Sequence, residues 1–244
     1  IIDHYNLDER WEFQVRKFVN NIAVIDDLAN RNHDCDLLID QNLYENMKQR
    51  YRNLVSKKCK MFLGPKYALI RTEFEIIRKT IQPRNKLNCI LVSFGGSDPT
   101  NETLKVIEAL RLTKLKNLKI HVVVGLSNPH REKIKRLCSS IPQIKFHFQV
   151  ENIASLMASV DLAIGAGGIT TWERCCLGLP ALVTILSADQ YELSRMVEKR
   201  GCTIMLGWSH IVTIDDYVKG INNIKLKKLY QMSKCGLELV DGKG

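Results

Sequence analysis

From residue 86 onward, short apolar runs alternate with stretches whose apolar positions recur at helical spacing. The apolar runs, which we expect to be strands, cover residues 89–94, 119–124, 144–149, 162–165, 181–186 and 203–206. The helical stretches between them cover residues 102–112, 130–139, 153–159, 171–177 and 191–199. Nearly continuous apolar strands separated by amphipathic helices predict a parallel sheet that is covered on both faces. This part of the chain is therefore predicted to be a doubly wound, Rossmann-like α/β domain.

Two of the predicted strands end in glycine-rich turns, FGGSDP at 94–99 and GAGGITTWE at 165–173. In a doubly wound sheet of order 3-2-1-4-5-6, the first and fourth strands are neighbours, and ligands bind beyond their carboxyl ends. If the strands take this order, both turns lie at one edge of the sheet. Such a turn lets the backbone approach a phosphate and opens a helix whose free N–H groups face the anion. We therefore expect a site for a nucleotide or a nucleotide-linked substrate.

The first part of the chain has a weaker pattern. Strands are predicted at 21–26, 35–40 and 60–63, with helices at 12–18 and 44–51. Three strands make a poor independent core, so we interpret this part as the second half of another α/β domain. We interpret residues 81–86 as the linker, which gives two domains, 1–82 and 83–244. Because the chain opens on Ile1 and not on Met, we expect it to be a fragment.

The composition is that of an ordinary soluble globular protein, with 45% hydrophobic and 25% charged residues. No apolar run approaches the roughly 18 residues that cross a bilayer. The net charge is +10, but the basic clusters are short and scattered. We interpret them as solvated helix faces, since no aromatic residues interleave with them as in a single-strand binder. No nucleic-acid partner and no integral membrane segment are expected.

The eight cysteines include no C-x-x-C pair, so we expect reduced thiols in a cytoplasmic protein. Carboxylates gather near the strand ends of the first domain, beside His33. They are Asp26, Asp27, Asp34, Asp36 and Asp40. Their spacing fits no standard metal motif, so we interpret them as turn formers and caps. Neither a metal nor a cofactor is expected.

Polar residues in and after the glycine turns each have two interpretations. Glu173 follows Thr170 by three residues, so it could close a capping box or grip two ribose hydroxyls. Gly95 and Gly96 could form a plain turn, with Asp98 or Asn101 capping the next helix, or they could admit a substrate. Their place at the predicted reversal of strand order favours a substrate site.

Three further residues each have a structural and a functional interpretation. Asp189 and Gln190 follow the fifth predicted strand, where they could cap a helix or face a sugar, and we favour the sugar. Tyr5 follows the opening strand and could reach a cleft between the domains or pack on the domain edge. No Ser-His-Asp or Cys-His arrangement and no glycosidase-like carboxylate pair can be assembled.

Motifs along nearly the whole chain resemble one family. They are DHY at 3–5, IDDLA at 25–29, HDCDLL at 33–38, DQN at 40–42, GPKYALIR at 64–71, FGGSD at 94–98, GAGG at 165–168, TWE at 171–173 and Gln190. The chain resembles the hydrolases of pseudaminic acid biosynthesis that release UDP from UDP-2,4-diacetamido-2,4,6-trideoxy-β-L-altropyranose. That family shares the two-domain glycosyltransferase-B architecture of the peptidoglycan enzyme MurG.

The resemblance implies which residues bind the UDP-sugar substrate. They are Gly95, Gly96, Gly167, Gly168, Ile169, Thr170, Trp172, Glu173 and Gln190. Among these, Glu173 would take the ribose and Gln190 would face the sugar, while Tyr5 matches a tyrosine near the reacting centre. The family's catalytic base is a His in a glycine-rich loop that none of the six histidines here matches. We therefore expect this chain alone to lack turnover.

The implied function is a nucleotide-sugar hydrolase in which water attacks the anomeric carbon without a metal. The alternative is a glycosyltransferase of the same architecture that passes the sugar to a lipid or protein acceptor. A non-catalytic nucleotide-sugar or nucleic-acid binder, suggested by the charge of +10, ranks third.

Overall fold

The computed structural model describes residues 1–113 and 117–244. Contacts between residues divide the chain into two compact units. Unit 1 consists of Ile1–Leu69 with Gly242–Gly244, and unit 2 consists of Ile70–Asp241. The segment 81–86, which we interpreted as a linker, therefore lies inside unit 2.

Unit 2 is built on a six-stranded parallel sheet. Its strands are β4 (Cys89–Ser93), β5 (Lys119–Val124), β6 (Ile144–Phe148), β7 (Leu162–Ala166), β8 (Ala181–Ile185) and β9 (Thr203–Trp208). They lie side by side in the order β6-β5-β4-β7-β8-β9, which is the predicted order 3-2-1-4-5-6. The prediction of a Rossmann-like domain is confirmed.

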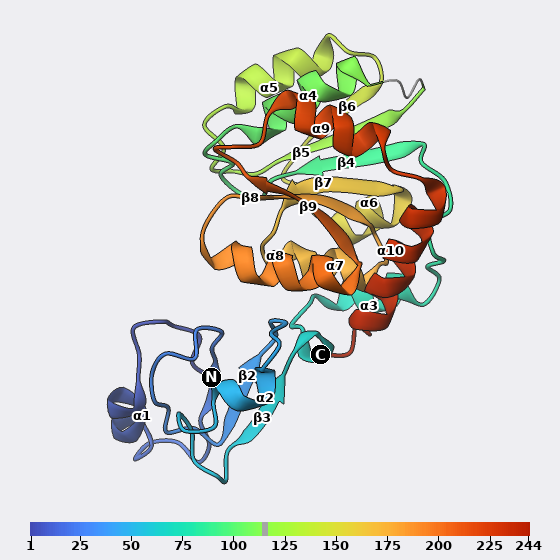
Figure 1. The fold of residues 1–244 in the computed structure, drawn as a ribbon. Coiled ribbons are helices and arrows are strands. Elements are labelled where there is room, and N and C mark those ends of the chain that lie inside the picture. The colour runs from blue at the N-terminus through green and yellow to red at the C-terminus, as the bar shows by residue number, and fades with distance from the viewer. Residues whose placement is uncertain (114–116) are drawn as a thin grey trace. The chain divides into compact units, whose positions relative to one another are not determined.

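Helices cover both faces of this sheet. They are α3 (Thr72–Arg78), α4 (Glu102–Leu112), α5 (Arg131–Ser139), α6 (Ile153–Ser159), α7 (Thr170–Cys176), α8 (Asp189–Arg200), α9 (Ile214–Asn222) and α10 (Leu226–Leu239). Figure 1 shows α4, α5 and α9 over one face and α7 and α8 over the other. A strand between two helical layers needs apolar side chains on both sides, and all five residues of β8 are buried. Among the described helices, none has both the length and the apolar character needed to cross a bilayer.

Arg84 explains why the expected linker belongs to unit 2. Its side chain is only 7% exposed, and its guanidinium donates hydrogen bonds to the carbonyl oxygens of Val160 at 3.2 Å and Leu177 at 2.6 Å. Its Nη2 donates to the carbonyl oxygen of Met157 at 3.1 Å. Burial lowers the pKa of Arg84 to about 10. Carbonyl oxygens at the ends of α6 and α7, which have no partner within their helices, thus accept hydrogen bonds from the Arg84 guanidinium, and these bonds hold the segment to unit 2.

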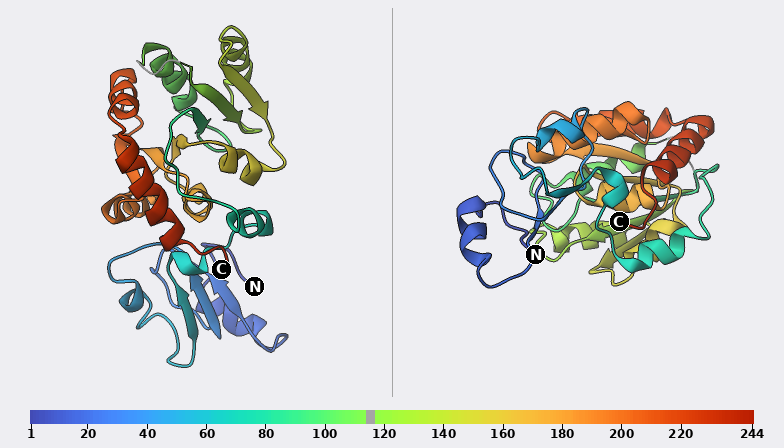
Figure 2. Two further views of the ribbon diagram at one scale, coloured as in Figure 1. Left: turned by 90° about the vertical axis from the view of Figure 1, so that its right-hand side faces the viewer. Right: turned by 90° about the horizontal axis from the view of Figure 1, so that it is seen from below.

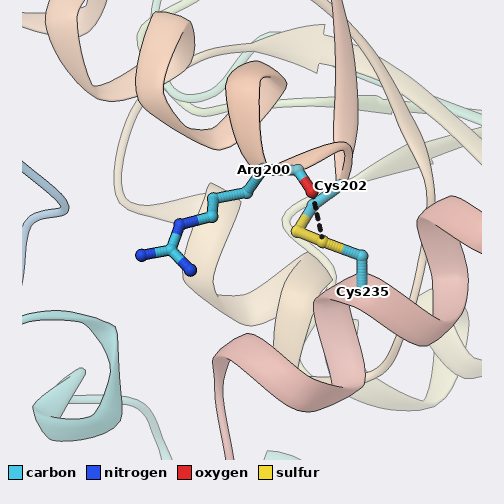
Figure 3. Close-up of a disulfide and its surroundings, with 3 residues drawn as sticks. All are labelled: Arg200, Cys202 and Cys235. Carbon is cyan, nitrogen blue, oxygen red and sulfur yellow. Dashed lines mark hydrogen bonds between the residues drawn. A yellow bond between two sulfur atoms is a disulfide. The ribbon is translucent and has the colours of Figure 1, made fainter.

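Helix α10 packs against α7 (Figure 2, red beside orange). Gly236 permits the close approach, because a Cβ atom there would lie 3.1 Å from the Cα atom of Cys175. A disulfide joins Cys235 in α10 to Cys202, which lies between α8 and β9 (Figure 3). The Cys235 Sγ also lies 3.2 Å from the carbonyl oxygen of Arg200. The expectation that every thiol is reduced is wrong for this pair, and the other six cysteines are free.

Unit 1 contains a three-stranded parallel sheet in the order β1-β2-β3. Its elements are α1 (Glu9–Val15), β1 (Ala23–Ile25), β2 (Leu37–Asp40), α2 (Met47–Arg50), β3 (Lys60–Leu63) and the 3₁₀ turn η1 (Pro65–Tyr67). Ile2 adds a parallel bridge to Val24 at the edge of β1. The apolar core is small and includes Val24, Leu38 and the fully buried Tyr51. Because the apolar core is so small, polar side chains make up a large part of what is buried in this unit.

Candidate functional site

The carboxyl ends of β4 and β7 meet at one edge of the sheet in unit 2. The two strands pair in parallel, with Ser93 opposite Gly165. A Cβ atom at Gly165 would fall 2.1 Å from the carbonyl oxygen of Ser93, so only glycine allows this approach. The prediction that these strands are neighbours is confirmed. Both glycine-rich turns therefore leave the sheet side by side.

The turn after β4 leaves its backbone open. Gly95 and Gly96 are exposed, and a Cβ atom at either would meet no atom within 4 Å. The turn after β5 lies directly against them, because a Cβ atom at Gly125 would fall 2.5 Å from the Cα atom of Gly96. Sequence reasoning missed Gly125. A glycine placed directly after a predicted strand was the signal that could have found it.

Asp98 closes this turn and caps α4. Its side chain is buried, and its two carboxylate oxygens accept hydrogen bonds from Glu102 N at 2.8 Å and Thr103 N at 3.0 Å. Asn101 makes no capping bond with its side chain. Of the two capping residues considered from the sequence, Asp98 is therefore the one that caps. Gly95 and Gly96 remain as the part of the turn that a ligand could approach.

Gln190 links the turns that follow β7 and β8. Its Oε1 accepts hydrogen bonds from Gly167 N at 3.3 Å and Leu186 N at 3.1 Å. Its Nε2 would lie 3.9 Å from a Cβ atom placed on Gly168. The N-cap of α8 is Ala188, so neither Asp189 nor Gln190 caps this helix. Gln190 is thus at the predicted site, with its carbonyl oxygen fastening the loops and its amide nitrogen beside Gly168.

Glu173 is engaged by an arginine. Its Oε1 lies 3.2 Å from Arg71 Nη2. The N-cap of α7 is Ile169, and no side chain caps the helix, so the capping box between Thr170 and Glu173, one of the two interpretations from the sequence, is not formed. Burial raises the pKa of Glu173, and the charge of Arg71 opposes that rise. A half-buried carboxylate beside the helix start is available to accept hydroxyl hydrogen bonds.

The remaining residues of this turn differ in exposure. Ile169 is 63% exposed, and Thr170 is half-buried. Trp172 is fully buried, so its place beside a ligand stays a prediction. Arg174, which sequence reasoning missed, is buried below the turn and donates to the carbonyl oxygen of Ala166 at 2.8 Å. Burial lowers the pKa of Arg174 to about 10.

The acidic residues of unit 1 take part in ion pairs and hydrogen bonds. Asp40 contacts Arg50 at 2.6 Å, and Asp26 contacts Arg31 at 2.7 Å. The hydroxyl of Tyr51 lies 3.0 Å from an Asp26 carboxylate oxygen and 3.1 Å from an Asp40 carboxylate oxygen. Across residues 1–113 and 117–244, no cluster of His, Cys, Asp and Glu could hold a metal ion.

A second buried contact in unit 1 joins Glu12 and His33, whose Nδ1 lies 2.7 Å from Glu12 Oε1. The other oxygen of Glu12 accepts a hydrogen bond from the backbone of Asp34 at 2.6 Å. Asp34 and Asp36 in turn both pair with Arg16. The interpretation as turn formers was incomplete, because cations from distant positions satisfy most of these carboxylates.

Tyr5 belongs to unit 1 and is 57% exposed. Partial burial raises the pKa of Tyr5 to about 12, with further contributions from the charge of Asp27 and a hydrogen bond to it. Its role near a reacting centre stays a prediction.

Known proteins match both the fold and this site-bearing unit. Residues 90–242 match the family described as the Glycosyltransferase family 28 C-terminal domain. The chain is 31% identical over 198 residues to the spore coat polysaccharide biosynthesis protein SpsG of Bacillus subtilis. The aligned residues make up 80% of this chain and 58% of SpsG. It is 31% identical over 172 residues to the UDP-2,4-diacetamido-2,4,6-trideoxy-β-L-altropyranose hydrolase of Campylobacter jejuni. The aligned residues make up 69% of this chain and 60% of that hydrolase. The predicted resemblance is confirmed.

Solved structures agree on the fold. MurG of Acinetobacter baumannii superposes with a TM-score of 0.61 at 13% identity, covering 95% of this chain and 66% of MurG. The chain spans about half the length of the curated relatives it matches.

Proposed function

This chain belongs to the glycosyltransferase family 28 C-terminal domain family, and from that premise we propose that its unit 2 binds the UDP part of a nucleotide sugar. In the full-length protein this binding serves hydrolysis that releases UDP from a UDP-linked 2,4-diacetamido-2,4,6-trideoxy sugar in pseudaminic acid biosynthesis. Support for that substrate comes from the 31% identity to a hydrolase of that name.

The observation that carries the proposal is the meeting of the exits of β4 and β7 beside Glu173. Gly165 brings the strands together, and Gly95 and Gly96 leave exposed backbone on one side of the exit. Gly168 and the Nε2 of Gln190 lie on the other side. Backbone N–H groups at such turns bind diphosphate, and a nearby carboxylate accepts hydrogen bonds from a ribose diol.

The chemistry that follows is displacement at the anomeric carbon. A water oxygen forms a bond to this carbon, the bond to the diphosphate oxygen breaks, and UDP leaves with the bonding electrons. The water proton passes to a general base. N–H groups aimed at the diphosphate stabilise the charge that develops on the leaving group. None of the six histidines of this chain is assigned the role of base.

The second candidate is a glycosyltransferase with the same nucleotide site. The match to a glycosyltransferase family and the MurG-like fold favour it as a class. The two candidates differ only in the nucleophile, which is water in one and an acceptor hydroxyl in the other. They therefore predict the same UDP binding by unit 2.

Calorimetry with UDP on the 244-residue chain tests the shared site. We expect saturable binding of one UDP, weakened in Glu173→Gln and unchanged in Arg111→Ala, whose side chain is on α4 and pairs with Glu108. No heat at millimolar UDP from a folded sample would contradict the proposal. For the full-length protein, release of UDP and free sugar without any acceptor would favour the hydrolase. Release only with an acceptor would favour the transferase.

A further inference from the structure

Arg71 lies at the start of α3, where the chain enters unit 2, and its guanidinium joins two carboxylates. Its Nη2 lies 3.2 Å from Glu173 Oε1, and its Nη1 lies 3.2 Å from Glu73 Oε1. Its Cζ atom also lies 5.3 Å from the centre of the Phe74 ring. These three contacts hold the guanidinium in one place, although half of the side chain is exposed.

The two acids need this cation between them. Glu173 and Glu73 are 14% and 27% exposed, so both carboxylates are partly removed from water. Burial raises the pKa of Glu173, the charge of Glu73 raises it further, and Arg71 and then Arg174 lower it. On the same helix, the charge of Glu173 acts on Arg174 and Cys176, where it favours the protonated forms. Without Arg71, two negative charges would face each other across the start of α3 and α7.

We propose that Arg71 is a positioning residue for nucleoside recognition, which holds Glu173 in the ionised state and orientation that accept the ribose hydroxyls of UDP. This role rests on the proposed function of unit 2. Each carboxylate oxygen can accept two hydrogen bonds, so Oε1 can receive Arg71 and one ribose hydroxyl together. Oε2 is then left for the second hydroxyl. Arg71 therefore stays in place when the ligand binds.

The sequence alone does not show this role. Arg71 stands 102 positions before Glu173 and ends the motif GPKYALIR, which contains no phosphate-binding pattern. Only the packing of α3 against α7 brings the two side chains together. Substitution of Arg71 should therefore act on the nucleotide site although the residue lies outside both glycine-rich turns.

Calorimetry with two ligands tests the proposal on the 244-residue chain. UDP carries both ribose hydroxyls, and 2′,3′-dideoxy-UDP lacks them. For Arg71→Ala we expect about a tenfold loss of affinity for UDP, typical of losing a charge-assisted contact, and little change for the dideoxy ligand. Arg71→Lys should recover part of the loss. Arg111→Ala is the matched control, since Arg111 is 54% exposed against 52% for Arg71 and also pairs with a glutamate.

The pH dependence gives a readout that a purely structural role would not change. Glu173 must be ionised to accept the hydroxyls, so UDP affinity falls as the pH drops through its pKa. Removing Arg71 raises that pKa, and this acid limb should shift to higher pH in Arg71→Ala. In a Glu173→Gln background, Arg71→Ala should cause no further loss, because the two substitutions remove one interaction.

Three results would overturn the proposal. Equal losses for UDP and the dideoxy ligand would indicate a general effect on folding or on phosphate binding. A gain in UDP affinity in Arg71→Ala would mean that Arg71 blocks the site. Unchanged affinity would mean that the ion pair is irrelevant to binding. If the wild-type chain binds neither ligand, the proposed function itself fails. This outcome is distinct from the three above, in each of which the wild-type chain binds UDP.

Discussion

The two units differ in how they use buried polar groups. In unit 2, β7 and β8 are almost entirely buried and apolar, and the candidate site at their ends is made largely of backbone and glycine. In unit 1, whose apolar core is small, Glu12, His33 and Tyr51 are buried and take part in hydrogen bonds with other side chains. Unit 2 also buries charged groups such as Arg84 and Arg174, but its large apolar core supplies most of its buried surface, whereas the small core of unit 1 depends more on side-chain networks.

The cysteines show the same contrast. Unit 2 carries the disulfide between Cys202 and Cys235. Unit 1 brings Cys35 and Cys59 to a distance of 3.6 Å between their sulfur atoms and leaves both as free thiols. Adding a reductant should therefore act on unit 2, through its disulfide, and spare unit 1, whose thiols are already reduced.

Gly165→Ala should have the largest effect. The added methyl group would overlap the carbonyl oxygen of Ser93, and β4 and β7 would have to separate. We expect a loss of at least about 4 kcal/mol in the free energy of unfolding of unit 2, measured by urea titration. Gly96→Ala is the control for stability, because its Cβ atom meets nothing within 4 Å. Equal stability of the two variants would contradict this account of the strand contact.

Removing the disulfide with the double substitution Cys202→Ala and Cys235→Ala should come next. The disulfide closes a loop between residues 33 positions apart and so restricts the unfolded chain. It should contribute about 3–4 kcal/mol to the free energy of unfolding, which the double variant loses. Thermal unfolding with and without reductant checks this. Reductant should destabilise the wild type and Cys59→Ala but not the double variant. A wild type that does not respond to reductant would contradict the disulfide.

The stability of unit 1 should fall as the pH rises from about 4 to about 6. Burial raises the pKa of Asp40 from 3.8 to about 6 and outweighs the charge of Arg50. The folded state therefore binds the proton of Asp40 more tightly than the unfolded state does. The stabilisation of the folded state by this proton is complete below pH 3.8 and is lost as the pH rises past about 6. The change is about 3 kcal/mol. Hydrogen exchange of the β1 and β2 amides measures it, and Asp40→Asn should remove this slope.

Tyr51→Phe should have the smallest of these effects. The hydroxyl of Tyr51 approaches Asp26 and Asp40, and its loss leaves buried carboxylate oxygens with one donor fewer. We expect a cost of about 1–3 kcal/mol, seen in the same hydrogen-exchange measurement. Tyr44→Phe is the matched control, because its hydroxyl donates to the Asp27 carbonyl oxygen at 3.2 Å in a partly buried position and not to a buried carboxylate. A larger effect of Tyr44→Phe would contradict the importance of the buried network.

Much of the fold followed from the sequence, and less of the site did. The strand order of unit 2 and the neighbouring exits of β4 and β7 were predicted and are present. The capping box of Thr170 with Glu173 was one of two interpretations and is not formed, since Glu173 turns to Arg71 instead. Arg84, taken as part of a linker, is buried in unit 2.

By itself, the sequence determined the alternation of strands and helices in unit 2, and with it the strand order and the edge at which the glycine turns meet. These depend on local apolar periodicity and on the handedness of parallel connections, both of which can be followed along the chain. Only the tertiary structure decided which side chain satisfies each buried charge. That choice pairs residues far apart in sequence, such as Arg71 with Glu173, through packing that no local pattern records.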